Sequence, residues 1–204
     1  MSRAQTRGEE WANALSHFLG VLAGIAAIIY FSSNDFGNGA VVFGLSLVLL
    51  YSVSTVYHLL PIGKLKHQFR ILDHSAIFIL IAGTYTPFLI EILDGSLQWI
   101  LLSGVWLFAT AGVLFKVFGG VEKRRISIIL YILMGWIFLM LAKPLWTALY
   151  PHSIFWLLAG GLFYTVGVFF YTWEKLPYNH FIWHLFVLAG SLSHIAGVYR
   201  FETA

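Results

Sequence analysis

Residues Gly39–Leu60 read GAVVFGLSLVLLYSVSTVYHLL, an uninterrupted stretch that contains no Lys, Arg, Asp or Glu. A helix that crosses the hydrocarbon core of a bilayer needs about 20 predominantly apolar residues. This stretch therefore has the length and the composition of one membrane-spanning helix. Six further stretches of the chain share these properties, so the sequence predicts an all-α, polytopic membrane protein built as a bundle of seven transmembrane helices.

The seven predicted spans all fall within the roughly 17–25 residues that a spanning helix takes. Four of the five prolines lie between them, where a missing backbone N–H does no harm. No connector is long enough to form a second domain, so we expect residues 1–204 to form a single seven-transmembrane domain. The predicted spans are Trp11–Ser33, Gly39–Leu60, Ile71–Leu93, Leu97–Phe115, Ile126–Ala142, Ser153–Trp173 and Asn179–Tyr199.

The overall composition excludes several other classes of protein. Hydrophobic residues make up 59% of the chain and charged residues only 10%, whereas about a quarter of a typical soluble domain is charged. The formal net charge of +3 comes from basic residues that are sorted by membrane side, so it does not indicate nucleic-acid binding. The chain has no cysteine, which leaves His, Asp and Glu as the possible protein ligands of a metal.

The distribution of basic residues predicts the orientation. Ten of the twelve Lys and Arg residues lie in the N-terminal segment and in the connectors on the same side of the membrane, and two lie on the other side. Because Lys and Arg accumulate in cytoplasmic loops, we expect the N-terminus in the cytoplasm and the C-terminus outside.

Rare polar residues gather at the cytoplasmic ends of three predicted spans. His58 is in the last turn of the second span, with Ser54 one turn earlier on the same helical face. Asp73 is predicted in the first turn of the third span. His180 and His184 open the last span at a spacing of four residues, so their rings project from one face. Polar side chains within a span are costly, and they are therefore candidates for a functional site.

The residue types in this group fit a zinc site. Two His at i and i+4 is a spacing that places two imidazoles on one Zn²⁺, and a catalytic zinc typically has three protein ligands and one water. We therefore predict that His58, His180 and His184 hold Zn²⁺. Asp73 would accept a proton from the zinc water, and Ser54 would orient that water or donate to a carbonyl oxygen.

Each of these residues taken alone also has an ordinary structural interpretation. The His pair can be interfacial, Asp73 suits the positive end of a helix, and Ser54 is a common residue at helix contacts. His17 can be a fourth ligand, support a ligand or bond a neighbouring helix. No metal-binding role is predicted for the other histidines. We expect His74 to pack against neighbouring residues, and His67 and His152 to be solvated in loops. His194 is too far from His184 to share its metal, although with Ser191 and Ser193 it can line a polar path or bond across helices.

Several short motifs and their order along the chain resemble those of the hemolysin III family. This family is the bacterial branch of the progestin and adipoQ receptor proteins, which are related to the alkaline ceramidases. The resemblance covers nearly the whole chain and predicts a bacterial plasma (inner) membrane protein. The motifs are Glu9-Glu10-x-x-Asn13-x-x-x-His17, Ser54-x-x-x-His58, Asp73-His74, Ala82-Gly83-Thr84-Tyr85-Thr86-Pro87-Phe88, and Asn179-His180-Phe181-Ile182-Trp183-His184 continuing to Gly190-Ser191 and His194.

This resemblance implies seven transmembrane helices and zinc at His58, His180 and His184, with Asp73 and Ser54 at the metal water. Relatives of the adiponectin-receptor type are linked to ceramide hydrolysis and lipid sensing, and bacterial members are named for pore formation and membrane homeostasis. The leading hypothesis is a zinc-dependent hydrolase of a lipid amide or ester, with membrane lipids or a free fatty acid in the bundle. A pore-forming protein and a lipid or membrane-fluidity sensor with a structural zinc are the alternatives.

Overall fold

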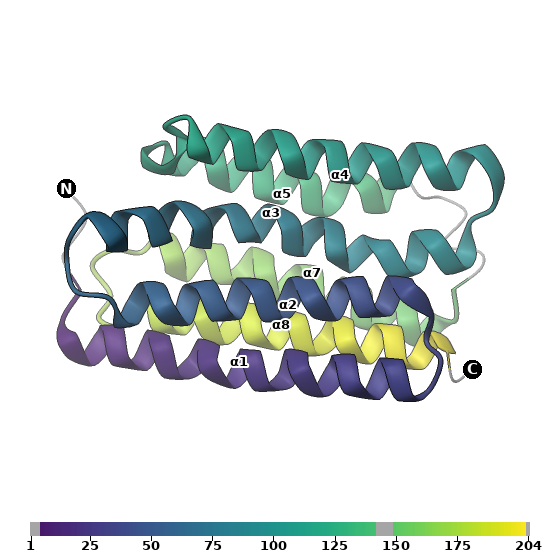
Figure 1. Ribbon diagram of the computed structural model, residues 1–204, viewed down its shortest axis with the longest axis horizontal. Helices are drawn as coiled ribbons and strands as arrows, with labels where there is room; N and C mark the ends of the chain where they lie inside the picture. The colour runs from purple at the N-terminus through teal and green to yellow at the C-terminus, as the bar shows by residue number, and fades with distance from the viewer. Residues whose placement is uncertain (1–4, 142–148, 203–204) are drawn as a thin grey trace.

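The protein is a bundle of α-helices that run along one common direction. The computed structural model describes residues 5–141 and 149–202, and within these ranges it contains seven α-helices, one 3-10 turn and no β-strand. Figure 1 shows the N-terminus and the C-terminus at opposite ends of the bundle. The elements are α1 (Arg7–Ser33), α2 (Gly37–Leu59), α3 (Lys64–Ile92), α4 (Gly95–Val117), η1 (Gly120–Glu122), α5 (Arg124–Leu141), α7 (Pro151–Thr172) and α8 (Asn179–Glu202).

The helices confirm the predicted all-α class. Among the described residues, α1 to α4, α7 and α8 are each long and apolar enough to cross a membrane. The predicted fifth span, Ile126–Ala142, corresponds to α5, although its last residue lies outside the described ranges. The protein is therefore a polytopic membrane protein.

The start of α3 was predicted wrongly. This helix begins at Lys64, well before the predicted Ile71, so His67 is helical and not in a loop, although it is exposed as expected. Asp73 accordingly lies in the third turn of the helix and not in the first. The hydropathy of a stretch identifies the part of a helix that sits in hydrocarbon, whereas Lys, Gln and Arg are good helix formers that extend α3 beyond that part.

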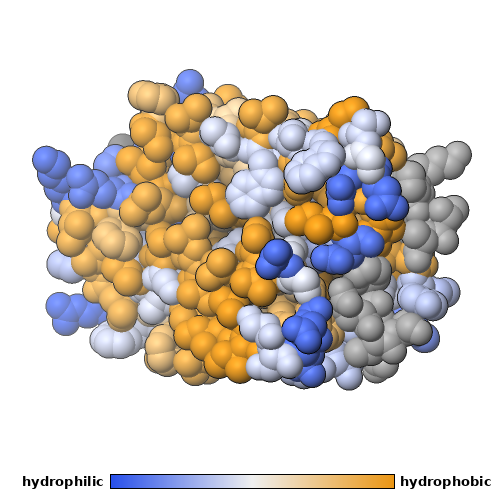
Figure 2. All heavy atoms as spheres, turned by 45° about the vertical axis from the view of Figure 1, so that its right-hand side comes forward, coloured by the Kyte–Doolittle hydropathy of each residue, from blue (hydrophilic) through white to orange (hydrophobic). Residues whose placement is uncertain are grey.

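The bundle is apolar outside, and several polar residues are buried within its largely hydrophobic core, as α1 illustrates. Leu15, Leu22 and Ile29 repeat every seven residues and are 59%, 49% and 61% exposed, whereas Asn13 and His17 on the opposite face are buried. Figure 2 shows hydrophobic atoms covering much of one face, with hydrophilic atoms gathered toward the two ends. An apolar exterior of this kind is solvated by lipid. Polar residues buried in the interior of such a bundle are costly, so they are candidates for the functional site.

Close contact between α2 and α3 depends on a small residue. A Cβ added to Gly39 would lie 2.7 Å from the backbone Cα of Pro87, which cannot rotate away. We therefore expect Gly39→Ala to destabilise the folded protein by about 1–3 kcal/mol through overpacking. The measurement is thermal unfolding of both forms in the same detergent. Gly135→Ala is the control, because nothing lies within 4 Å of its Cβ position, and an equal effect of the two substitutions would contradict the packing argument.

Candidate metal centre

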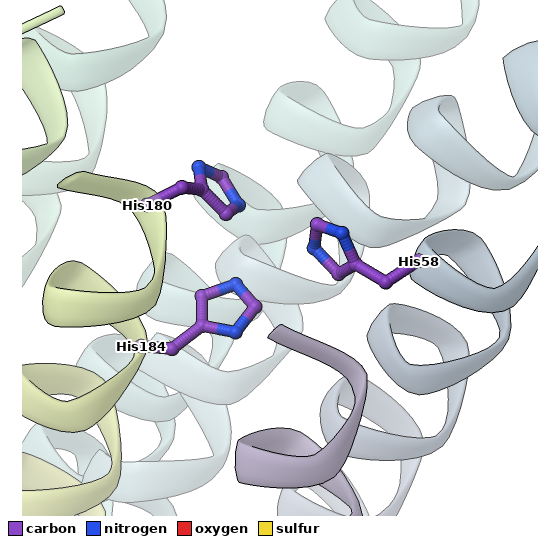
Figure 3. A group of neighbouring side chains, drawn as sticks. All are labelled: His58, His180 and His184. Atoms are coloured by element: carbon purple, nitrogen blue, oxygen red, sulfur yellow. The ribbon is translucent and has the colours of Figure 1, made fainter. Parts of the chain in front are cut away.

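Three histidines from two helices meet at one end of the bundle. His58 comes from the last turn of α2, while His180 and His184 come from the first two turns of α8. One possible ligand atom from each of the three lies within 4.8 Å of the others. Figure 3 shows the rings of His180 and His184 facing the ring of His58 across a common space. The predicted residues are thus brought together, with His58 and His184 buried and His180 partly buried.

The hydrogen bonds of the rings show which nitrogen is available to a metal. His58 Nδ1 lies 2.6 Å from a Glu10 carboxylate oxygen. His184 Nδ1 lies 3.2 Å from the backbone oxygen of Asn13. In both cases an acceptor faces Nδ1, so the proton belongs on Nδ1 and the lone pair on Nε2. The Nε2 atoms of His58, His180 and His184 are all buried and have no hydrogen-bond partner among the described residues.

This donor set fits a divalent transition metal. Buried polar atoms nearly always have a partner, so three convergent imidazole nitrogens without one are an exception that needs a reason. Neutral imidazole is a ligand for Zn, Cu, Fe and Ni, and a metal that binds Nε2 would supply the missing partner. The cluster could therefore hold a metal ion.

Helix α1 contacts two of the candidate ligands on the side away from the cluster. Besides contacting His58, Glu10 accepts a 2.8 Å hydrogen bond from Lys66 of α3, and Ser16 lies 3.3 Å from His184 Nδ1. A metal-binding His usually donates its second N–H to a carboxylate or backbone carbonyl, which fixes the ring. Glu10 and the Asn13 carbonyl hold the positions that this role requires. Sequence reasoning assigned them no such role, although Glu10, Asn13 and His17 follow one another at helical spacing.

The start of α1 is fixed against the start of α8. Thr6 and Glu9 form a reciprocal capping box at the helix N-terminus. Glu9 also accepts a 2.8 Å hydrogen bond from the backbone N–H of Tyr178, the residue before α8. This contact ties α1, which carries Glu10 and Asn13, to α8, which carries two of the candidate ligands.

His17 lies beside the cluster but does not complete it. Its ring stacks on His184, with centroids 3.4 Å apart and planes 8° from parallel. The nitrogen lone pairs of two stacked rings lie in two separate parallel planes, so they do not converge on one ion. Among the described residues the metal-capable group consists of His58, His180 and His184 alone, which leaves His17 as a neighbour of the candidate ligand His184.

The two predicted catalytic residues are buried in the same region. Ser54 is one turn before His58, is completely buried, and its side chain interacts with Asp73. Asp73 is 6% exposed and interacts electrostatically with His58. Their roles in catalysis remain predictions.

A cavity of about 140 Å³ lies between α3, α5, α7 and α8, and both Asp73 and His17 contribute to its wall. An engineered cavity of about 150 Å³ in another protein binds benzene, so this one has room for an apolar group. Most of its lining is aliphatic or aromatic, including Ile77, Leu80, Ile132, Leu157, Val168 and Val187.

Comparison with known proteins identifies the family. The sequence profile of the Haemolysin-III related family matches residues 5–195. The chain belongs to this family. It is 47% identical to Hemolysin-3 of Bacillus cereus over 190 residues, which cover 90% of this chain and 87% of the relative. It is also 43% identical to a Hemolysin-3 homolog of Bacillus subtilis (strain 168), with 90% and 89% coverage.

A more distant relative of this Haemolysin-III related protein is human. The chain is 26% identical to the monocyte to macrophage differentiation factor of Homo sapiens over 207 residues, covering 95% of this chain and 84% of the relative. The family match confirms the resemblance inferred from the motifs. Together with the apolar helices, the Bacillus relatives also agree with the predicted multi-pass protein of a bacterial plasma membrane.

The remaining histidines of this Haemolysin-III related protein lie apart from the cluster. The backbone oxygen of His74 accepts a 2.7 Å hydrogen bond from Tyr131, and its side chain is partly buried, in agreement with a packing role. His152 is exposed, but it lies in the first turn of α7 and not in a loop. His194 is buried, lines the cavity, and belongs to a different part of α8 from His184.

Proposed function

We propose that this Haemolysin-III related protein is a zinc-dependent hydrolase that cleaves an amide or ester bond of a membrane lipid. The observation that supports it best is the group of three buried His Nε2 atoms, which have no hydrogen-bond partner among residues 5–141 and 149–202 and lie near an apolar cavity that Asp73 lines. His58, His180 and His184 would hold the zinc. Bound zinc supplies a Lewis acid that polarises a carbonyl and makes water more acidic.

The residues of the chain account for the proton transfers. Hydrolysis of an amide adds one water and releases a carboxylic acid and an amine. Asp73 takes the proton from the attacking water and gives it to the leaving nitrogen or oxygen, as a general base and then a general acid. The Ser54 hydroxyl donates a hydrogen bond to the carbonyl oxygen as negative charge develops there.

The cavity determines which compounds reach these groups. Its largely apolar wall suits a hydrocarbon chain, and Asp73 on the same wall places a reacting bond near the end of that chain. Because an apolar pocket excludes water, the electrostatic interactions inside it are strengthened. A fatty acyl amide or ester therefore fits the cavity better than a polar, water-soluble substrate.

The geometry supports this function over the two alternatives. A structural zinc site usually has four protein ligands, whereas the described group offers three, with His17 stacked beside it. A pore would need a continuous hydrophilic lining, and the cavity wall is mostly apolar. Three candidate protein ligands with the Asp73 carboxylate in the same region favour a catalytic site over a structural one.

Asp73→Asn provides the test. We expect this variant to retain metal but to hydrolyse acyl-amide lipids at least about 100-fold more slowly, since a positioned general base contributes 10²–10⁴-fold. Release of fatty acid by purified, zinc-loaded protein from a panel of acyl amides and esters is the measurement. Asp35→Asn is the matched control, because Asp35 is exposed in the turn after α1. If Asp73→Asn matches the wild type, or no lipid of the panel is cleaved, the proposal is wrong.

A further inference from the structure

A second hollow, lined by basic side chains, lies at the end of the bundle that is predicted to face the cytoplasm. It has a volume of about 570 Å³ and lies where η1 and the start of α5 meet the end of α7. Figure 1 shows the turn between α4 and α5 at the same end of the bundle as the N-terminus. Small-molecule sites usually have volumes of roughly 300–1,000 Å³. The polar residues that line this hollow are Glu122, Lys123, Arg124, Arg125, Thr172 and Glu174.

Both carboxylates on the wall of the hollow are already paired within the protein. Glu174 forms an ion pair with Arg124, and the guanidinium of Arg124 also donates to the backbone oxygen of Tyr171. Glu122 pairs at 2.8 Å with Arg70 of α3. Arg124 is therefore fixed as part of the wall, and neither carboxylate is left to balance another cation.

Lys123 and Arg125 carry the positive charges that the protein does not balance. Both side chains are exposed, and neither forms an ion pair with any residue that the structure describes. The hollow also lies at the N-terminus of α5, where the first backbone N–H groups have no partner in their own helix and favour an anion. The uncompensated charge of the hollow is therefore positive, and it suits a negatively charged group.

An apolar, outward-facing track continues along α5 from the hollow. Ile126, Ile129, Leu133 and Ile137 follow one another at spacings of three and four residues, and they are 48%, 56%, 50% and 44% exposed. Residues at these spacings share one face of a helix, so this face of α5 contacts hydrocarbon in a membrane. Ile126 belongs both to the track and to the wall of the hollow. The hollow therefore lies where the headgroup region meets the hydrocarbon core.

The combination of hollow and track selects one class of ligand. A phosphate that is attached to acyl chains uses both features, whereas a free phosphate gains nothing from the track. A zwitterionic headgroup brings an ammonium group close to Lys123 and Arg125, which repel it. Lys and Arg at this end also favour the predicted orientation, but that role depends on charge alone and requires no hollow. Basic pockets between transmembrane helices on the cytoplasmic side are known to bind anionic headgroups.

We propose that this hollow binds the phosphate of an anionic phospholipid from the cytoplasmic leaflet. Lys123 and Arg125 contact the phosphate, and the acyl chains lie along the track that begins at Ile126. This lipid site goes beyond the proposed function, because it shares no residue with the histidine cluster or with the cavity that Asp73 lines. The protein would thus bind the lipid whether or not it holds a metal.

Native mass spectrometry of the purified full-length protein in detergent tests the proposal. Phosphatidylglycerol and phosphatidylcholine with the same acyl chains are titrated separately, and the bound lipids per chain are counted. We expect the first phosphatidylglycerol to bind about 30-fold more tightly than phosphatidylcholine, because each of two basic residues near an anionic headgroup contributes about fivefold. Equal affinities would overturn the proposal. A large excess of inorganic phosphate should leave the lipid bound, and its displacement would assign the hollow to free anions and refute the lipid site.

Variants show whether the preference arises in the hollow. Lys123→Gln and Arg125→Gln should each reduce the preference about fivefold and together abolish it, whereas Lys123→Arg combined with Arg125→Lys should keep it. Arg7→Gln combined with Lys64→Gln is the matched control, because it removes the same charge from exposed residues outside the hollow. Thermal unfolding in the same detergent verifies that each variant is folded. A preference that survives the double Gln variant, or that the control reduces equally, would show that the hollow does not select the lipid.

Discussion

The His58→Ala variant is expected to lose its metal. Three imidazoles share the ion in the proposed site, and removal of one leaves only the pair on α8. Loss of an outer partner of a metal ligand alone costs about 10–100-fold in affinity, so loss of a ligand should cost more than about 100-fold. His184→Ala should behave in the same way, because it removes a ligand from the other helix.

Metal analysis of the purified proteins measures this effect. The wild type should carry one zinc per chain after exposure to a mixture of divalent metals, and competition with a chromophoric chelator gives the relative affinities. His67→Ala and His152→Ala remove exposed histidines that lie outside the cluster, and they should bind metal as the wild type does. If His58→Ala retained one zinc per chain, the zinc would be bound at a site other than the histidine cluster.

The Glu10→Gln variant is expected to bind zinc about 10–100-fold more weakly while the bundle remains folded. Glu10 lies 2.6 Å from His58 Nδ1 and also accepts a hydrogen bond from Lys66. Gln keeps the shape of the side chain but removes its charge. The ring of His58 then loses the carboxylate that fixes its orientation and raises its basicity as a ligand.

Chelator competition and thermal unfolding separate this effect from simple destabilisation. Glu122→Gln is the matched control, because Glu122 pairs at 2.8 Å with the partly exposed Arg70 and is not part of the histidine cluster. We expect the control to leave the metal affinity unchanged, since exposed ion pairs contribute little. If Glu10→Gln binds zinc as tightly as the wild type, Glu10 does not support His58 as a ligand. Its carboxylate then serves only the ion pair with Lys66.

Local patterns in the sequence predicted most of the fold and the cluster of three histidines. Apolar length identified the helices, and the four-residue spacing of His180 and His184 placed both on one face. The depth of His58 followed from alternating the direction of successive spans. These inferences needed no knowledge of how the helices pack, because each depends on one helix and the membrane.

Contacts between helices were not predictable in the same way. Glu10 and Asn13 reach the ligands only because α1 lies against both α2 and α8. The cavity depends on how α5 and α7 pack against α3 and α8, and no pattern within a single helix encodes that arrangement. The start of α3 was also predicted wrongly from the sequence, because hydropathy does not detect helical turns that extend beyond the hydrocarbon core.

The order of the helices also has a consequence for biosynthesis. Among the described helices, α1 with Glu10 is synthesised before α2 with His58, and the other two imidazoles come only with α8. A nascent chain that stops before residue 179 would own one ligand and could not capture an ion tightly. Zinc binding at the proposed site would therefore be a late event, because it would require α2 and α8 to be both inserted and packed against each other.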